Sequence, residues 1–249
     1  MPPGGAPDLL EPVTRCLVAN QTSAHSHDDF ARRPCHAPRV KLYGTPLSHF
    51  TRKVRIVLAE LGVPFEMVWA RSVLAATPDA YAENPLMRVP ALVDDGELVI
   101  DSDHIARYLV GRFDPGDRLG VRSERVADLN ALAVLDGIMD NEVVLILAKR
   151  GGVANLEDIA YFRKLASAID GALAWIDDRI APESAAFDYR DITLVCLWQH
   201  LLHYQLVGGL DRYAKIAARV ARCAERPSVA ASTPQASLEA ARAAGWQPA

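Results

Sequence analysis

The sequence of 249 residues has only four cysteines, and none of them belongs to a C-x-x-C pair. Closely spaced cysteines are typical of small disulfide-bonded domains and of structural zinc sites. Their absence argues against both classes and indicates a protein of a reducing compartment. We therefore expect a cytoplasmic location.

Long hydrophobic runs are also missing. The longest purely apolar stretches, such as residues 143–148, are far shorter than the roughly 18–20 residues that a membrane-spanning helix needs. The first residues lack both a basic segment and an apolar segment, so no secretory signal is visible. No membrane is expected as a partner.

Neither sign of charge is in large excess. The chain has 27 basic and 31 acidic side chains, which gives a formal net charge of −4, and it has no stripe of lysine and arginine. Nucleic-acid-binding surfaces usually carry such a stripe, so no nucleic acid is expected as a partner. Apolar residues make up 50% of the chain, which is typical of a folded globular protein.

The N-terminal part differs from the rest of the chain. Residues 1–38 hold six of the 16 prolines and three of the seven histidines, and they show no sustained periodicity. This composition predicts a flexible N-terminal extension. Cys16 and Cys35 do not stand at the usual spacing of zinc ligands relative to these histidines. No metal site is expected in the chain.

The region from residue 40 to 114 alternates between strand and helix patterns. Strands are predicted at 40–43, 64–69, 90–93 and 97–100, the last two joined by a hairpin turn at residues 94–96. Helices are predicted from Ser48 to Gly62, over 79–83, and from Asp101 onward. The first strand, helix and strand form a βαβ unit, whose crossover is expected to be right-handed.

The pattern changes near residue 121, after a boundary at Pro115–Gly116. Alanine- and leucine-rich segments then predict helices at roughly 122–149, 156–180, 190–206, 211–225 and 234–244. The fold class is therefore α/β plus all-α. A small α/β domain at 40–114 is followed by an all-helical domain at 122–246.

Five motifs in this order resemble the cytosolic glutathione S-transferase family, in its bacterial type with serine at the catalytic position. The stretches that carry the resemblance are 42–58, 84–93, 100–109, 188–192 and 226–228. The resemblance implies a thioredoxin-like, glutathione-binding domain at 40–114 and a substrate-binding helical domain at 122–246. It also implies a homodimer.

Ser48 is the candidate catalytic residue. A serine before a helix is ordinarily a cap, but at a strand–helix turn its hydroxyl and the first helical N–H groups converge on one point, which suits an anion. Lowering a thiol pKa by about two units from 8.5 takes roughly 2.7 kcal/mol. A hydrogen bond to a charged group supplies about 1.5–3 kcal/mol, and a helix N-terminus about 0.3–1 kcal/mol. In the resembled family the serine here stabilises the glutathione thiolate, which implies the same role for Ser48.

Other residues near this turn are alternatives. Tyr43 is the main rival, because other classes of the family use a tyrosine near the end of the first strand, and Thr45 and Thr51 are weaker ones. Relatives with cysteine at the position of Ser48 perform thiol–disulfide exchange, which a serine cannot do. His49 is expected to be exposed in the first helical turn, near the bound thiolate, where it belongs to the glutathione site.

The resemblance implies further contacts with glutathione. The backbone of Val89, which precedes Pro90 across a bond that is cis in the family, pairs with the cysteinyl part. Arg88 can meet a glutathione carboxylate. Asp101 and Ser102 begin a helix and take the γ-glutamyl end, the serine binding its carboxylate and the aspartate its ammonium.

Some motifs are interpreted as structural. Asp188 and Asp191 have the spacing of a capping box at the start of a helix, and Cys196 falls in an apolar stretch and is expected to be inert core. Four residues of the first long helix are weaker candidates for the wall of a second-substrate pocket: Leu132, Asp136, Met139 and Asp140.

The resemblance implies a transferase with glutathione as co-substrate and an electrophilic small molecule as the second substrate, in detoxification. Two alternatives stay open. One is glutathione-dependent isomerisation or dehalogenation at the same site. The other is a non-catalytic protein of this fold that binds another protein. The joint presence of Ser48, Val89–Pro90 and Asp101–Ser102 favours a working glutathione site over the last alternative.

Overall fold

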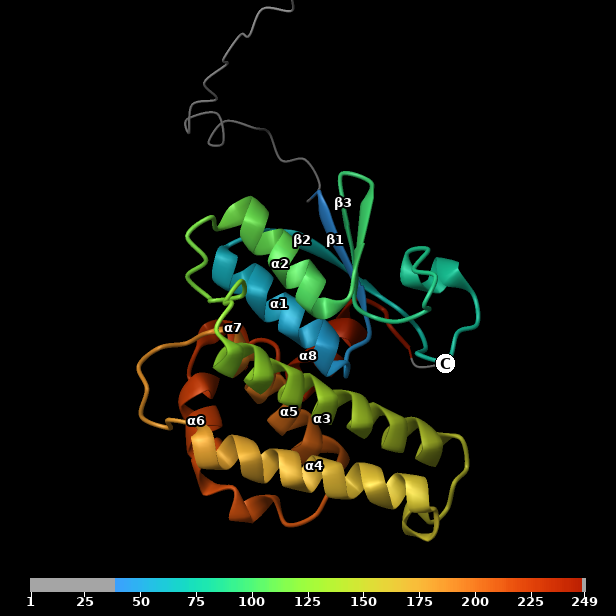
Figure 1. The fold of residues 1–249 in the computed structure, drawn as a ribbon. Coiled ribbons are helices and arrows are strands. Elements are labelled where there is room, and N and C mark those ends of the chain that lie inside the picture. Colours follow the sequence, from blue (N-terminus) through green and yellow to red (C-terminus); the bar gives the residue numbers. More distant parts are fainter. Residues whose placement is uncertain (1–38, 248–249) are drawn as a thin grey trace, which may run out of the picture. The chain divides into compact units, whose positions relative to one another are not determined.

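The computed structural model of the chain describes residues 39–247 (Figure 1). The flexible extension predicted for residues 1–38, together with Cys16 and Cys35, lies outside the described residues. Within the described part, no helix combines the length and the apolar character needed to cross a bilayer.

A mixed sheet of four strands is the first half of the fold. Its strands are β1 (Val40–Gly44), β2 (Phe65–Trp69), β3 (Ala91–Asp94) and β4 (Glu97–Ile100), in the spatial order β2-β1-β3-β4. β1 runs parallel to β2 and antiparallel to β3, and β3 and β4 form the predicted hairpin. Asp95 and Gly96 turn this hairpin with positive φ angles of 53° and 86°, the geometry that two-residue hairpin turns favour.

Two helices accompany the sheet. Helix α1 (His49–Leu61) begins at the cap Ser48 and ends at Gly62, whose φ of 67° is left-handed, as predicted. Helix α2 (Ser102–Phe113) lies beside it (Figure 1). The apolar residues of α1 that recur at helical spacing, Val54, Val57 and Leu58, are fully buried. This half therefore has the thioredoxin-like arrangement expected from the sequence.

The second half of the fold is helical. Its helices are α3 (Val126–Arg150), α4 (Ala160–Arg179), α5 (Tyr189–Tyr204), α6 (Ala214–Ala224), α7 (Pro227–Ala230) and α8 (Pro234–Ala243). Helix α5 packs against α1, α3 and α6 and is buried over most of its length. The fold class, α/β plus all-α, is confirmed. All described residues fall within one compact unit, and the division into domains at 40–114 and 122–246 stays a prediction.

The structure differs in local detail from two of the predicted elements and adds a short helix that was not predicted. The helix predicted at 79–83 is a 3-10 turn over Pro78–Tyr81, because Ala82 and Glu83 have positive φ angles of 55° and 64°. The segment predicted as one helix from 156 begins with a separate 3-10 turn at Leu156–Asp158. Helix α7 was not predicted; its single turn starts at Pro227, which suits a first helical position.

Candidate functional site

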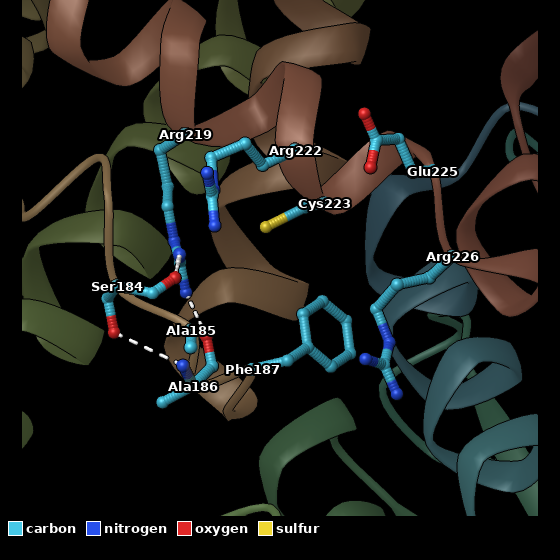
Figure 2. Close-up of a pocket in the computed structure, with 9 residues that line it drawn as sticks. All are labelled: Ser184, Ala185, Ala186, Phe187, Arg219, Arg222, Cys223, Glu225 and Arg226. Atoms are coloured by element: carbon cyan, nitrogen blue, oxygen red, sulfur yellow. Dashed lines mark hydrogen bonds between the residues drawn. The ribbon is translucent and has the colours of Figure 1, made fainter.

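A small pocket of about 190 Å³ lies between the segment 184–187 and helix α6 (Figure 2). The guanidinium of Arg219 already has protein partners and is not free for a ligand. It donates to the carbonyls of Ser184 and Ala186 and pairs with Asp191 at 2.6 Å. Burial raises the pKa of the Cys223 thiol to about 11, so it is protonated at neutral pH and a poor nucleophile. The side chain of Arg219 therefore holds the segment 184–187 against α6, which is a structural role.

A much larger cavity, of about 860 Å³, is the candidate functional site. One wall comes from the turn between β1 and α1 and from the loop segments 71–74 and 86–89. The opposite wall comes from α3 and from the end of α5. Four of the predicted site residues line it: Ser48, His49, Arg88 and Val89.

Ser48 is the N-cap of α1, as predicted. Its Oγ accepts a hydrogen bond from the backbone N–H of Thr51 at 3.1 Å, and the side chain is partly exposed to the cavity. The first turn of α1 contains no acidic residue. The positive end of the helix dipole is therefore left for an anion in the cavity.

The tight turn before Ser48 depends on Gly44. A Cβ on Gly44 would lie 2.2 Å from the side chain of Thr51, so no larger residue fits there. Thr51 is itself 1% exposed and does not line the cavity, and neither does Tyr43. Of the alternatives to Ser48, Thr45 alone is part of the wall.

The loop 84–89 brings Arg88 and Val89 to the same cavity. Asn84, which is buried, holds the loop: its Nδ2 donates to the carbonyl of Arg88 at 2.9 Å, and its Oδ1 accepts from the N–H of Leu86 at 3.0 Å. Met87 has a left-handed φ of 49°. The Val89–Pro90 bond is cis, as the resemblance implied. The positioning role of Asn84 was missed, although the residue lies in a motif that the sequence analysis singled out.

Three other predicted site residues, Pro90, Asp101 and Ser102, do not line this cavity. Asp101 has a φ of 72° and caps α2, its Oδ1 accepting from the N–H groups of Asp103 and His104 at 3.0 and 3.1 Å. Ser102 is the first residue of α2 and is 4% exposed. The observed role of the Asp101 carboxylate is therefore to cap the N-terminus of α2.

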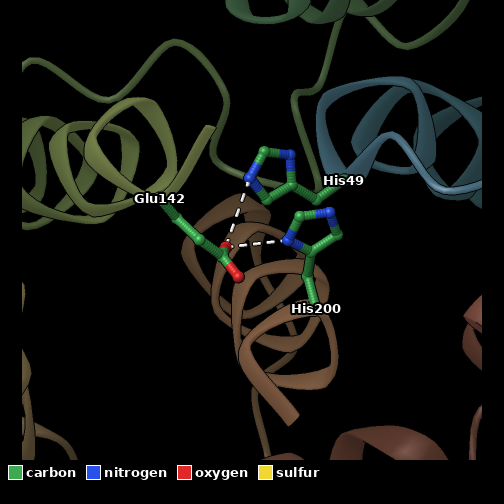
Figure 3. Close-up of side chains that lie close together, drawn as sticks. All are labelled: His49, Glu142 and His200. Carbon is green, nitrogen blue, oxygen red and sulfur yellow. Dashed lines mark hydrogen bonds and ion pairs between the residues drawn. The ribbon is translucent and has the colours of Figure 1, made fainter. Parts of the chain in front are cut away.

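The prediction that His49 is exposed was wrong, because the first turn of α1 faces α3 and α5. His49 is 2% exposed, and its ring stacks on that of His200 with centroids 4.0 Å apart. Figure 3 shows the edges of both rings facing the carboxylate of Glu142. The Oε2 atom of Glu142 lies 2.7 Å from His200 Nδ1 and 3.6 Å from His49 Nε2. Both histidines line the cavity.

Burial sets the ionisation of this group of three residues. It lowers the pKa of His49 well below its ordinary value, with help from His200 and Lys53, so that His49 is neutral at pH 7. Burial also raises the pKa of Glu142, against the hydrogen bond from His200. His49 Nε2 and Glu142 Oε1 are buried without a hydrogen-bond partner. Each such atom costs about 1–3 kcal/mol.

Glu142 and His200 were not among the residues predicted from the sequence. The only sequence signal was a polar residue within an otherwise apolar helical segment, and that signal does not reveal which residues face each other. These three side chains are the ones in the described part of the chain whose donor atoms are grouped closely enough to hold a metal ion.

A second polar group lies where α1, α2 and α3 meet. Lys53, which is fully buried, donates to Asp103 Oδ1 and Asp136 Oδ1, both at 2.6 Å. Burial raises the pKa of Asp136 to about 7, against the charge of Lys53. Of the four residues expected in a second-substrate wall, Asp140 lines the cavity, whereas Leu132, Asp136 and Met139 do not.

The chain is similar to known glutathione S-transferases. Residues 42–117 match the family model of the glutathione S-transferase N-terminal domain. Glutathione S-transferase 3 of Zea mays is 41% identical over 76 residues, which is 30% of this chain and 34% of that protein. The curated relatives are matched over about a third to a half of their own length, 34% to 54%.

Solved structures match over a longer range. A glutathione S-transferase from Methylobacillus flagellatus with glutathione bound is 26% identical, with a TM-score of 0.67, and the match covers 78% of this chain and 99% of that one. A glutathione transferase family member from Pseudomonas fluorescens Pf-5 with bound glutathione is 28% identical, with a TM-score of 0.67 and coverage of 78% and 98%. Fold, motifs and relatives agree: residues 42–117 match the glutathione S-transferase N-terminal domain, and the chain is similar over most of its length to solved glutathione transferases.

Proposed function

We propose that this protein is a glutathione transferase in which Ser48 stabilises the thiolate of bound glutathione for attack on an electrophile. The observation that carries the proposal is the place of Ser48. Its hydroxyl lies at the positive end of α1, on the wall of a large cavity that it shares with Val89 and Arg88.

The two walls of the cavity suit two different substrates. On one wall, the Val89 backbone is proposed to pair with the cysteinyl part of glutathione and Arg88 to meet a carboxylate. Ser102 and Asp101, which do not line the cavity, are proposed to hold the γ-glutamyl end. On the other wall, α3 contributes Val143, Val144, Ile146 and Leu147. These apolar side chains favour an electrophile with an apolar body.

The proposal assigns glutathione binding to residues 40–114 and electrophile binding to residues 122–246. It includes a homodimeric state and a role in detoxification, which rest on the resemblance alone, and a cytoplasmic location, which rests on the cysteine content.

The test is binding to immobilised glutathione, followed by turnover of an aryl halide with glutathione by the purified full-length protein. We expect elution by free glutathione and conjugation well above the uncatalysed rate. Binding without turnover of the aryl halide would favour the isomerase or dehalogenase alternative, which a screen of such substrates then examines. If neither binding nor turnover is seen, the protein is a non-catalytic member of the family.

A further inference from the structure

The buried group of His49, Glu142 and His200 has no part in the proposed transferase chemistry. It joins three elements that are distant in sequence, since His49 opens α1, Glu142 lies in the middle of α3, and His200 lies near the end of α5. The side chains of His49, Glu142 and His200 are 2%, 0% and 6% exposed. We propose that these three residues form a binding site for a divalent first-row transition-metal ion at the edge of the large cavity.

The spacing of the donor atoms suits such an ion. The candidate ligand atoms lie within 4.8 Å of one another. Metal bonds to imidazole nitrogen and carboxylate oxygen are about 2.0–2.2 Å long. With bonds of about 2.1 Å, the separation of 2.7 Å between Glu142 Oε2 and His200 Nδ1 corresponds to an angle of about 80° at the metal. The separation of 3.6 Å to His49 Nε2 corresponds to an angle of about 120°. Angles of about 90° and about 120° occur together in a five-coordinate, trigonal-bipyramidal ion, and tetrahedral coordination would require the smaller angle to open.

The unpartnered atoms point to a ligand rather than to a complete hydrogen-bond network. His49 Nε2 and Glu142 Oε1 are buried and unpaired in the protein, and buried polar atoms of this kind call for a partner. A metal ion bound to the three side chains takes up His49 Nε2 directly. Binding through Nε2 moves the ring proton to Nδ1 and gives up the contact of 3.1 Å between Nδ1 and the backbone N–H of Phe50.

The surrounding charges permit a cation. Lys53 is the nearby positive group that acts on His49, but Asp103 and Asp136 each pair with it at 2.6 Å. Glu142 supplies one negative charge to the site, and a neutral His49 has a lone pair to give.

The ligand set indicates the class of metal. Two imidazoles and one carboxylate are the set used for zinc and for non-haem iron(II), and such sites keep open positions for a further ligand. Here both histidines line the cavity, so a further ligand can approach from that side. Calcium and magnesium prefer oxygen ligands and are not expected to bind.

The test uses the full-length protein after treatment with a chelator and dialysis, titrated with Co²⁺ and with Zn²⁺. We expect one tight equivalent of Co²⁺ with a visible ligand-field band, displaced by Zn²⁺. In Glu142→Gln the affinity of this equivalent should fall by about a hundredfold or more, since even outer-shell changes at metal sites cost about 10–100-fold. His203→Gln is the matched control, because His203 is exposed on the same helix as His200. It should leave the affinity unchanged.

The comparison of wild type with Glu142→Gln also distinguishes this site from metal bound by cysteines and histidines of residues 1–38, because those residues are identical in all variants. Absence of a tight equivalent in the wild type would overturn the proposal. Equal affinity and an equal spectrum in wild type and Glu142→Gln would do so as well, because the metal would then be bound elsewhere. If Glu142→Gln fails to fold, as judged by circular dichroism, His200→Gln carries the same comparison. The measurements need no transferase activity, so the metal site and the proposed function stand or fall separately.

Discussion

At the scale of single residues, the observed cap at Ser48 and its proposed contact with a thiolate do not compete. Its Oγ lone pair accepts from the N–H of Thr51 and caps α1, while its hydroxyl proton stays available for a thiolate in the cavity. The helix N-terminus and the hydroxyl would both stabilise the anionic form of a thiol bound beside Ser48, so their effects on its pKa would add.

Replacing Ser48 by alanine isolates the hydroxyl. A hydrogen bond to a charged group is worth about 1.5–3 kcal/mol, so the pKa of bound glutathione should rise by roughly one to two units. Conjugation at pH 7 should then fall by about ten- to a hundredfold. Loss of the cap should lower the free energy of unfolding by only about 1 kcal/mol. Titration of the thiolate absorbance of bound glutathione measures the pKa directly.

Thr45→Ala is the control for Ser48→Ala, because Thr45 lines the same cavity. It should leave the pKa of bound glutathione unchanged. If the pKa is the same in wild type and Ser48→Ala, the activating role passes to another group. Thr45 is then the first to be examined, because it lines the cavity and Tyr43 does not.

His49 shows what sequence reasoning can and cannot reach at this scale. The cap at Ser48 was predictable, because capping depends on neighbours one turn away. Exposure of the next residue depends on what the helix end packs against, and His200 in α5 lies 151 residues further along the chain. The stacking of His49 on His200 is therefore invisible until the fold is known.

At the scale of elements, one buried lysine joins α1, α2 and α3. Burial raises the pKa of Asp103, but the charge of Lys53 and hydrogen bonds outweigh it and the net change is downward. For Asp136 burial dominates, and its pKa is about 7. Two carboxylates thus share a single ammonium, and Asp136 is the one that retains a proton near neutrality.

This sharing predicts a dependence of stability on pH. The pKa of Asp136 is above its ordinary value of 3.8, so between these two values the folded chain binds more protons than the unfolded chain. The contribution of Asp136 to the free energy of unfolding should therefore fall as pH rises from about 4 to about 7. Asp136→Asn removes this contribution. In urea unfolding from pH 5 to pH 8, the free energy of unfolding of the wild type should fall relative to that of Asp136→Asn. Parallel pH profiles would contradict the assignment.

The two aspartates of the capping box of α5 should contribute differently to the free energy of unfolding. Asp188 and Asp191 both complete the box, but Asp191 also pairs with Arg219, whose side chain is 5% exposed. Asp188→Ala should cost about 1 kcal/mol of unfolding free energy. Asp191→Ala leaves a buried arginine without its carboxylate and should cost about 3–5 kcal/mol. Chemical denaturation of the two variants measures the ratio, and equal losses would mean that the Arg219 pair adds nothing.

Helices and strands were predicted correctly where periodicity and caps agree. The prediction failed where one or two residues with unusual φ angles, or a single helical turn, decide the conformation. The strands and the longer helices have strong patterns and were found with small errors at their ends. The 3-10 turn at Pro78–Tyr81 was read as a helix, because nothing in the sequence shows that Ala82 and Glu83 have positive φ angles. Helix α7 is a single turn, too short to show a period.

At the scale of the whole molecule, side chains of α1 tie the sheet to the C-terminal helices. Arg52 donates to the carbonyl of Val229 and to Ser232 Oγ, both at 3.2 Å. Glu60 accepts two hydrogen bonds from Arg226, at 2.6 and 3.1 Å. This pair accounts for the role of the 226–228 motif, which the sequence analysis noted without a physical reason.

These ties predict that the described residues unfold in one transition. A buried arginine that bonds across 177 and 180 residues of sequence couples the stability of both halves. Urea unfolding followed by far-UV circular dichroism, which mainly reports α3–α8, should therefore coincide with loss of hydrogen-exchange protection in β1 and β3. Arg52→Met removes hydrogen bonds from a charged group, worth about 1.5–3 kcal/mol, and should lower both midpoints together. A sheet that loses protection at lower urea than the helices, or an Arg52→Met effect confined to one half, would mean that the two halves are stable separately.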